Sequence, residues 1–130
     1  KRMRIEGDYM DKKILVVDDA MFMRSIIRKI LKEAGYTQVW EAQDGEKAME
    51  LFREVSPDLV LLDITMPGRS GLEVLEEMLG LVPNVRVIMC SAVGQEMMIQ
   101  KALTIGASDF IVKPFKADEF SRIVNRCLEQ

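Results

Sequence analysis

Short apolar runs alternate with amphipathic stretches along most of the chain. Five of these runs have the length and composition of strands that are buried in a parallel sheet. They are Ile14–Val17, Gln38–Ala42, Leu59–Leu62, Val85–Cys90 and Phe110–Val112. The run Leu59–Leu62 contains only branched aliphatic residues and ends directly on the carboxylate of Asp63. That run is therefore predicted to be a central strand.

A stretch with apolar residues at helical spacing follows each strand. Gly35 and Gly106 are expected to end the first and fourth helices, and Asp44 is expected to cap the second. The predicted helices are Met21–Ala34, Glu46–Val55, Gly71–Leu79, Gln95–Ile105 and Ala117–Leu128.

Five alternations of strand and helix predict an α/β domain whose parallel sheet is covered on both faces. The expected architecture is flavodoxin-like: a doubly wound, five-stranded parallel sheet of order 2-1-3-4-5 with five helices. Residues 1–12 are polar without a period, and we interpret them as a leader or an expression remnant. Residues 13–130 are predicted to form one domain.

Composition removes several classes of function. The 130 residues carry a net charge of -3, with basic and acidic residues interspersed, so no nucleic-acid surface is expected. No apolar run is long enough to span a membrane and no signal peptide is recognisable, so the expected location is the cytoplasm. The absence of histidine excludes a Ser/His/Asp triad and histidine-ligated zinc. Cys90 and Cys127 are expected to be reduced and packed.

Polar residues follow four of the predicted strands. Asp18 and Asp19 follow the first, Asp63 the third, Ser91 the fourth and Lys113 the fifth. The carboxyl ends of parallel strands meet at one sheet edge, where α/β domains place their ligands. Three carboxylates at one edge repel each other unless a cation neutralises them, and Mg²⁺ suits oxygen ligands of this kind.

These residue types suit phosphoryl transfer, in which charge on the phosphoryl oxygens must be stabilised. Asp63 is the expected nucleophile, and Asp18, Asp19 and the Thr65 carbonyl are expected to help it hold Mg²⁺. Lys113 and the Ser91 hydroxyl would bind phosphoryl oxygens.

Each residue also has a structural interpretation. Asp18 and Asp19 could cap the first helix, Lys113 could be a solvated turn residue, and Ser91 could bond a loop amide. These interpretations require independent coincidences at one sheet edge, so we favour the functional one.

The motifs VVDDA, LLDITMPGRSG, CSA and VKPF, spread over five β/α units, resemble the receiver domain of two-component response regulators. The resemblance covers Lys13–Leu128, and DDAMFMR, CSAVGQ and GASDFIVKPF are most similar to the single-domain chemotaxis regulators of the CheY type. It implies phosphorylation at Asp63, a metal site at Asp18, Asp19 and Thr65, a switch hydroxyl at Ser91, a phosphate-binding Lys113 and an aromatic switch residue at Phe110.

The resemblance also implies partners and an output. The phosphoryl group would come from a histidine kinase or a phosphotransfer protein, and the chain would catalyse only its own phosphorylation and dephosphorylation. The last two β/α units would then change which output protein binds, such as a flagellar switch or another effector. Met21 and Phe22 are expected either to dock the phosphodonor or to pack under a loop.

Other classes stay open at this stage. A haloacid-dehalogenase-type phosphatase requires an acid two residues after its nucleophile, where this chain has Thr65. A flavodoxin requires a phosphate loop where Asp18 and Asp19 would repel the phosphate. A receiver that is part of a larger methylesterase or DNA-binding regulator, and a module that binds partners without phosphorylation, are further alternatives.

Overall fold

The computed structural model describes residues 11–129, which form a five-stranded parallel sheet flanked by five helices. The strand order is β2-β1-β3-β4-β5, as predicted. The elements in chain order are β1 (Lys13–Val17), α2 (Met21–Glu33), β2 (Gln38–Ala42), α3 (Gly45–Val55), β3 (Leu59–Asp63), α4 (Gly71–Leu81), β4 (Arg86–Ala92), α5 (Glu96–Ile105), β5 (Asp109–Lys113) and α6 (Ala117–Leu128). Most of the predicted leader, residues 1–10, lies outside the described residues.

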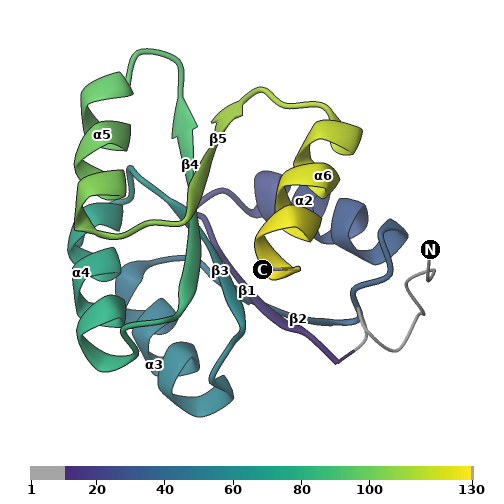
Figure 1. Cartoon of the computed structure of the whole chain (residues 1–130), viewed down its shortest axis with the longest axis horizontal. Helices are drawn as coiled ribbons and strands as arrows, with labels where there is room; N and C mark the ends of the chain where they lie inside the picture. The colour runs from purple at the N-terminus through teal and green to yellow at the C-terminus, as the bar shows by residue number, and fades with distance from the viewer. Residues whose placement is uncertain (1–10, 130) are drawn as a thin grey trace.

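The helices form one layer on each face of the sheet. Helices α3, α4 and α5 cover one face, and α2 and α6 cover the other (Figure 1). The strand β1 shows why both faces are apolar: Leu15 and Val17 pack toward the first layer, whereas Ile14 and Val16 pack toward the second. All five residues of β3 are buried, which confirms that it is a central strand.

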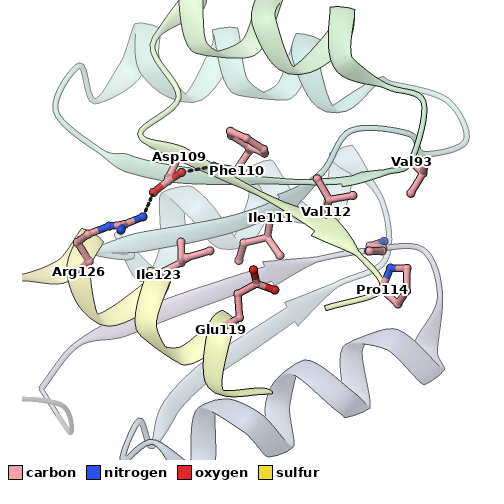
Figure 2. A pocket seen from close by; sticks show the side chains of 10 residues that line it. Val93, Asp109, Phe110, Ile111, Val112, Pro114, Glu119, Ile123 and Arg126 are labelled. Atoms are coloured by element: carbon pink, nitrogen blue, oxygen red, sulfur yellow. Dashed lines mark hydrogen bonds and ion pairs between the residues drawn. The ribbon is translucent and has the colours of Figure 1, made fainter. Parts of the chain in front are cut away.

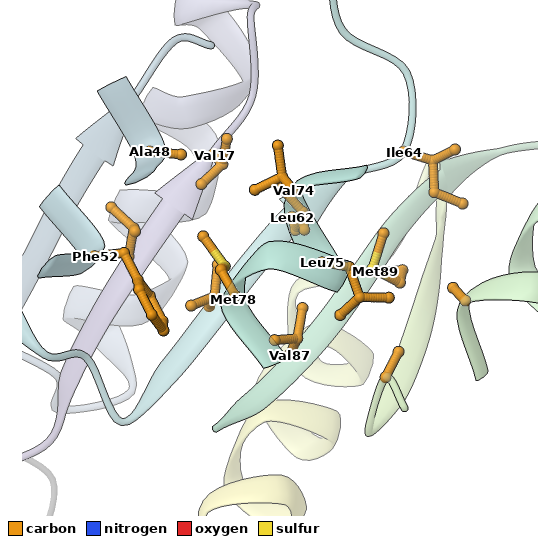
Figure 3. Close-up of a cluster of buried hydrophobic side chains, with 14 of the residues drawn as sticks. Val17, Ala48, Phe52, Leu62, Ile64, Val74, Leu75, Met78, Val87 and Met89 are labelled. Carbon is orange, nitrogen blue, oxygen red and sulfur yellow. The ribbon is translucent and has the colours of Figure 1, made fainter. Parts of the chain in front are cut away.

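The core under α3, α4 and α5 is packed by aliphatic and thioether side chains. In Figure 3, Met78 of α4 lies between Phe52 of α3 and Val87 of β4. Unbranched methionine side chains fill such irregular gaps well. Both cysteines are free and buried, as expected.

Local hydrogen bonds define where several helices begin and end. The Asp44 side chain accepts from the Lys47 amide and caps α3, as predicted. Ser70 and Glu73 form a capping box at the start of α4. Gly106 ends α5 with φ 138°, a conformation that side chains disfavour. The predicted helix and strand boundaries differ from these elements by two residues at most.

Candidate functional site

Two acidic residues follow β1 and differ in burial. Asp18 is 1% exposed, whereas Asp19 is exposed. The Asp18 amide donates to the Ala42 carbonyl at 3.1 Å, and Nη1 of Arg24 donates to the Asp18 carbonyl at 2.6 Å. Oδ1 of Asp18 accepts from the amide of Ala20, the residue before α2, at 2.9 Å. No side chain caps α2, so the interpretation of Asp18 and Asp19 as helix caps is wrong. The Asp18 side chain instead orders the turn that precedes the helix.

Asp63 is the last residue of β3 and is 7% exposed. Burial raises the pKa of its carboxyl from 3.8 to about 6, because the buried carboxylate loses hydration. The charge of Lys113 opposes this rise, and the charge of Asp18 adds to it. Oδ1 of Asp63 also accepts a hydrogen bond from the Thr65 amide at 3.3 Å. The carboxyl is therefore a weaker acid than an exposed aspartate, and a nearby cation would favour its ionised form.

Lys113, at the end of β5, lies between the two buried acids. Its Nζ is 2.7 Å from Oδ2 of Asp18 and 3.5 Å from Oδ2 of Asp63. Burial alone would lower the pKa of Lys113, but the hydrogen bond to Asp18 and the charges of both acids raise it. The lysine is therefore a charged residue of the site, and the interpretation as a solvated turn residue is wrong. The Lys113-Pro114 peptide bond is cis.

The three carboxylates meet closely enough to share a cation. One ligand oxygen from each of Asp18, Asp19 and Asp63 lies within 4.8 Å of the others. Among residues 11–129, the ammonium group of Lys113 is the only cation that forms an ion pair with these acids. A set of hard oxygen donors with excess negative charge fits Mg²⁺. Thr65, whose carbonyl is the fourth predicted ligand, lies in the loop that follows Asp63.

Ser91 lies inside β4 and is completely buried. Within residues 11–129 its Oγ has no hydrogen-bond partner, so the interpretation as a loop-amide contact is wrong. A buried hydroxyl without a partner costs about 1–3 kcal/mol. It follows Cys90, which pairs in register with Asp63, so Ser91 lies at the same carboxyl edge of the sheet as that acid. The site therefore contains an unused hydrogen-bond donor.

Phe110 belongs to β5 and is 37% exposed. Its ring extends from the strand on the side opposite to Ile111, which points toward α6 (Figure 2). Asp109 beside it forms an ion pair with Arg126 at 2.9 Å. The aromatic side chain predicted to be a switch residue is thus in an outward position.

Residues 14–125 match the response regulator receiver domain. The chain belongs to this family. The match covers most of the chain, which excludes the phosphatase and flavodoxin alternatives as descriptions of this domain. The order of the strands is that of the receiver fold.

The receiver is similar to proteins that have different names and roles. It is 52% identical over 106 residues to the chemotaxis protein CheY of Listeria monocytogenes, covering 82% of this chain and 89% of that protein. It is 38% identical to the sporulation initiation phosphotransferase F of Bacillus subtilis, over 92% of this chain and 95% of that protein. The crystal structure of the receiver domain of NtrX from Brucella abortus superposes with a TM-score of 0.87 at 37% identity, covering 91% and 99% of the two chains.

The structure adds site residues that the sequence patterns did not identify. Gln95 bonds Thr65 and the amide of Ala92 across two loops of the receiver. Gly71 lies so close to Asp63 that a Cβ there would be 2.2 Å from the Asp63 carbonyl oxygen. A glycine after a turn is a weak signal for a close approach, and no sequence pattern predicts the Gln95 contacts.

Two apolar side chains stand at the start of α2. Met21 is 71% exposed and Phe22 is 77% exposed, so neither packs under a loop. Their role as a docking surface stays a prediction. In the described part of the receiver, no helix has the length and apolar character needed to cross a bilayer.

Proposed function

We propose that this receiver accepts a phosphoryl group on Asp63 and uses the modification to change partner binding. The observation that carries the proposal is the buried carboxylate of Asp63, 3.5 Å from the Lys113 ammonium, at the sheet edge where β4 carries the unpartnered Ser91 hydroxyl. Burial of Asp63 limits the access of bulk water to an acyl phosphate. The Lys113 ammonium stabilises the negative charge that develops on the transferred group.

The proposed reaction is a displacement at phosphorus. An oxygen of the ionised Asp63 carboxylate attacks the phosphorus of a phosphohistidine on a histidine kinase or phosphotransfer protein, and the bond from phosphorus to the imidazole nitrogen breaks. The electron pair of that bond stays on the imidazole nitrogen, which takes a proton from solvent, and Asp63 retains the phosphoryl group as an acyl phosphate. Lys113, which pairs with Asp18 and Asp63 in the unmodified receiver, then binds a phosphoryl oxygen. Water later hydrolyses the acyl phosphate and restores the carboxylate.

Asp18, Asp19, Asp63 and the Thr65 carbonyl would hold Mg²⁺. When bound, the ion supplies the positive charge that three carboxylates and a phosphoryl group require beyond the single charge of Lys113. The arrangement of the three carboxylates, with oxygens within 4.8 Å, supports this assignment. Phosphorylation is therefore expected to depend on a divalent cation.

Ser91 and Phe110 are the proposed switch. The buried Ser91 hydroxyl gains a partner when a phosphoryl oxygen arrives, so modification favours movement of β4 toward Asp63. Phe110, which is 37% exposed, then turns inward toward the space that Ser91 leaves. The surface formed by the last two β/α units changes as a result, and an output protein reads the change.

We assign the receiver to chemotaxis signalling in the cytoplasm, with a flagellar switch protein or another effector as the output partner. The similarity to a chemotaxis protein at 52% identity supports this assignment. The similarity to a sporulation phosphotransferase supports the alternative of a relay that passes its phosphoryl group to another protein. Exposed Met21 and Phe22 beside the acidic pair suit docking of the phosphodonor.

The test is intact-mass measurement after incubation with acetyl phosphate, with and without Mg²⁺. We expect one phosphoryl adduct on the native chain that requires Mg²⁺ and disappears on standing. Asp63→Asn should abolish the adduct. Asp58→Asn is the matched control, because Asp58 is an exposed acid just before β3, and this variant should keep the adduct.

The outcomes separate the candidate functions. An adduct on the Asp63→Asn variant would move the phosphorylation site elsewhere. Absence of any adduct on the native chain would favour a module that binds partners without phosphorylation. Transfer of the group from the phosphorylated chain to a histidine-containing protein would favour the relay.

A further inference from the structure

Gln95 connects two loops at the edge of the site. Its side-chain Oε1 accepts a hydrogen bond from the Ala92 amide at 2.7 Å, and its Nε2 donates to Oγ1 of Thr65 at 2.6 Å. Gly94 makes this return possible, because its φ of 95° turns the chain back toward Ala92. We call these two hydrogen bonds the Gln95 bridge.

The bridge joins segments that follow the two central residues of the site. Thr65 lies two residues after Asp63, and Ala92 lies one residue after Ser91. Gln95 precedes α5, but its side chain does not cap that helix. Both of its polar groups are therefore used to hold the loop after β3 against the loop after β4.

The described arrangement is the one expected before phosphorylation. The Ser91 hydroxyl has no partner among residues 11–129, and Phe110 is exposed. For Ser91 to reach a phosphoryl group on Asp63, the adjacent Ala92 must move with it. We expect that movement to disturb the 2.7 Å bond from the Ala92 amide to Gln95, whose other end is tied to Thr65.

We infer that the Gln95 bridge stabilises the unphosphorylated arrangement of this receiver and thereby opposes the switch, an inference that rests on the proposed phosphorylation of Asp63. Gln95 is a positioning residue, since it acts through Thr65 and Ala92. If the Gln95 bridge forms only in the unmodified state, its removal shifts the equilibrium toward the modified arrangement. A ligand that favours that arrangement then binds more tightly. For exposed hydrogen bonds the expected gain is about two- to fivefold.

The first measurement is independent of phosphorylation. Hydrogen exchange of the Ala92 amide reports its bond to Gln95 directly. We expect Gln95→Ala to accelerate this exchange by about fivefold or more. Thr65→Val should accelerate it less, because it removes only the bond between Gln95 and Thr65 and keeps the shape of the Thr65 side chain. Gln100→Ala, an exposed glutamine in α5, is the control and should change nothing.

The second measurement is the affinity for beryllium fluoride, which with Mg²⁺ mimics an acyl phosphate. Gln95→Ala should bind it about two- to fivefold more tightly than the native chain, and Gln100→Ala should match the native chain. In a Thr65→Val background, Gln95→Ala should add little, because the bridge has already lost its anchor. Urea denaturation of each variant separates this effect from a change in overall stability.

The outcomes distinguish this inference from the proposed function. Unchanged Ala92 exchange in Gln95→Ala would show that the bridge does not form. Altered exchange with unchanged or weaker beryllium fluoride affinity would show that the bridge does not oppose the switch. A native chain that neither binds beryllium fluoride nor forms an adduct would refute the proposed function and the inferred effect on switching, while the exchange would still report whether the bridge exists.

Discussion

The two ends of the parallel sheet use the same residue types with opposite consequences. At the amino ends of the strands, the Lys13 amide donates to Oδ2 of Asp58, and the Asp58 amide donates to the Lys13 carbonyl, both at 2.8 Å. The Lys13 ammonium donates to the Val55 carbonyl at 3.3 Å. At the carboxyl ends, Asp18 and Asp63 are buried and share one lysine, Lys113.

The difference lies in solvent and in the balance of charge. Asp58 is exposed to solvent, and its carboxylate accepts a hydrogen bond from the backbone amide of Lys13 on the neighbouring strand. Asp63 is buried among other acids, so its ionised form is unfavourable and its pKa rises to about 6. The acids at the carboxyl ends of the strands therefore lower the stability of the fold. Binding of a cation or a phosphoryl group at this site would recover stability.

The largest expected effect on stability is that of a substitution at Gly71, the first residue of α4. Gly71 lies at the carboxyl end of the sheet, and a Cβ there would be 2.2 Å from the Asp63 carbonyl oxygen and 2.8 Å from Cα of Ile64. Gly71→Ala should lower the free energy of unfolding by about 3 kcal/mol or more, because backbone atoms must move. Urea denaturation measures this change.

Gly80 is the matched position near the other end of the same helix. A Cβ at Gly80 would meet nothing within 4 Å, so Gly80→Ala should raise the free energy of unfolding by about 0.5–1 kcal/mol. Similar destabilisation by both substitutions would contradict a close approach specific to the site.

Removal of the site lysine should have the next largest effect. Lys113→Met leaves Asp18 and Asp63 without their cation, and the free energy of unfolding should fall by about 2–3 kcal/mol at neutral pH. Millimolar Mg²⁺ should recover part of this loss, because it binds the folded site. Lys13→Met, at the amino end, should cost less than about 1 kcal/mol. Equal losses in the two variants would remove the contrast between the ends of the sheet.

Asp63→Asn should stabilise the protein in a manner that depends on pH. Because folding raises the pKa of Asp63 from 3.8 to about 6, the folded state prefers the protonated carboxyl, and the ionised form weakens the fold above that range. Asp63→Asn should therefore add about 2 kcal/mol near pH 8 without Mg²⁺ and almost nothing near pH 4.

Urea denaturation over this pH range provides the measurement, and Asp58→Asn provides the control. The control should change the free energy of unfolding by less than about 0.5 kcal/mol at either pH. If Asp63→Asn raised the free energy of unfolding equally at all pH values, the ionised carboxylate would not be what destabilises the native chain.

The smallest expected effect concerns two serines. Ser91 has a buried hydroxyl without a partner among residues 11–129, so Ser91→Ala should raise the free energy of unfolding by about 1 kcal/mol. Ser108, just before β5, accepts a hydrogen bond from the Val87 amide at 3.4 Å, so Ser108→Ala should lower it by about 0.5 kcal/mol. Thermal denaturation shows whether the two variants change stability in opposite directions. Destabilisation by Ser91→Ala would indicate that the Ser91 hydroxyl has a hydrogen-bond partner in solution.

The apolar runs of the sequence were sufficient to predict the sheet. Branched aliphatic residues such as those of Leu59–Leu62 suit only a strand that is buried on both faces, and the helical spacing between runs predicts crossovers. Once the strands are parallel, their carboxyl ends share one edge, so Asp18, Asp63 and Lys113 had to lie near one another. The family motifs then indicated the role of each residue.

The distances between distant segments depend on the packed structure and follow no pattern along the chain. Asp18 and Asp19 are adjacent in sequence, yet the first is 1% exposed and the second is exposed, because only Asp18 faces Lys113 across the sheet. The unpartnered Ser91 hydroxyl and the Gln95 bridge likewise arise where separate loops meet. Local periodicity describes which face a residue occupies, whereas hydrogen bonding and pKa depend on atoms that only folding brings within a few ångströms.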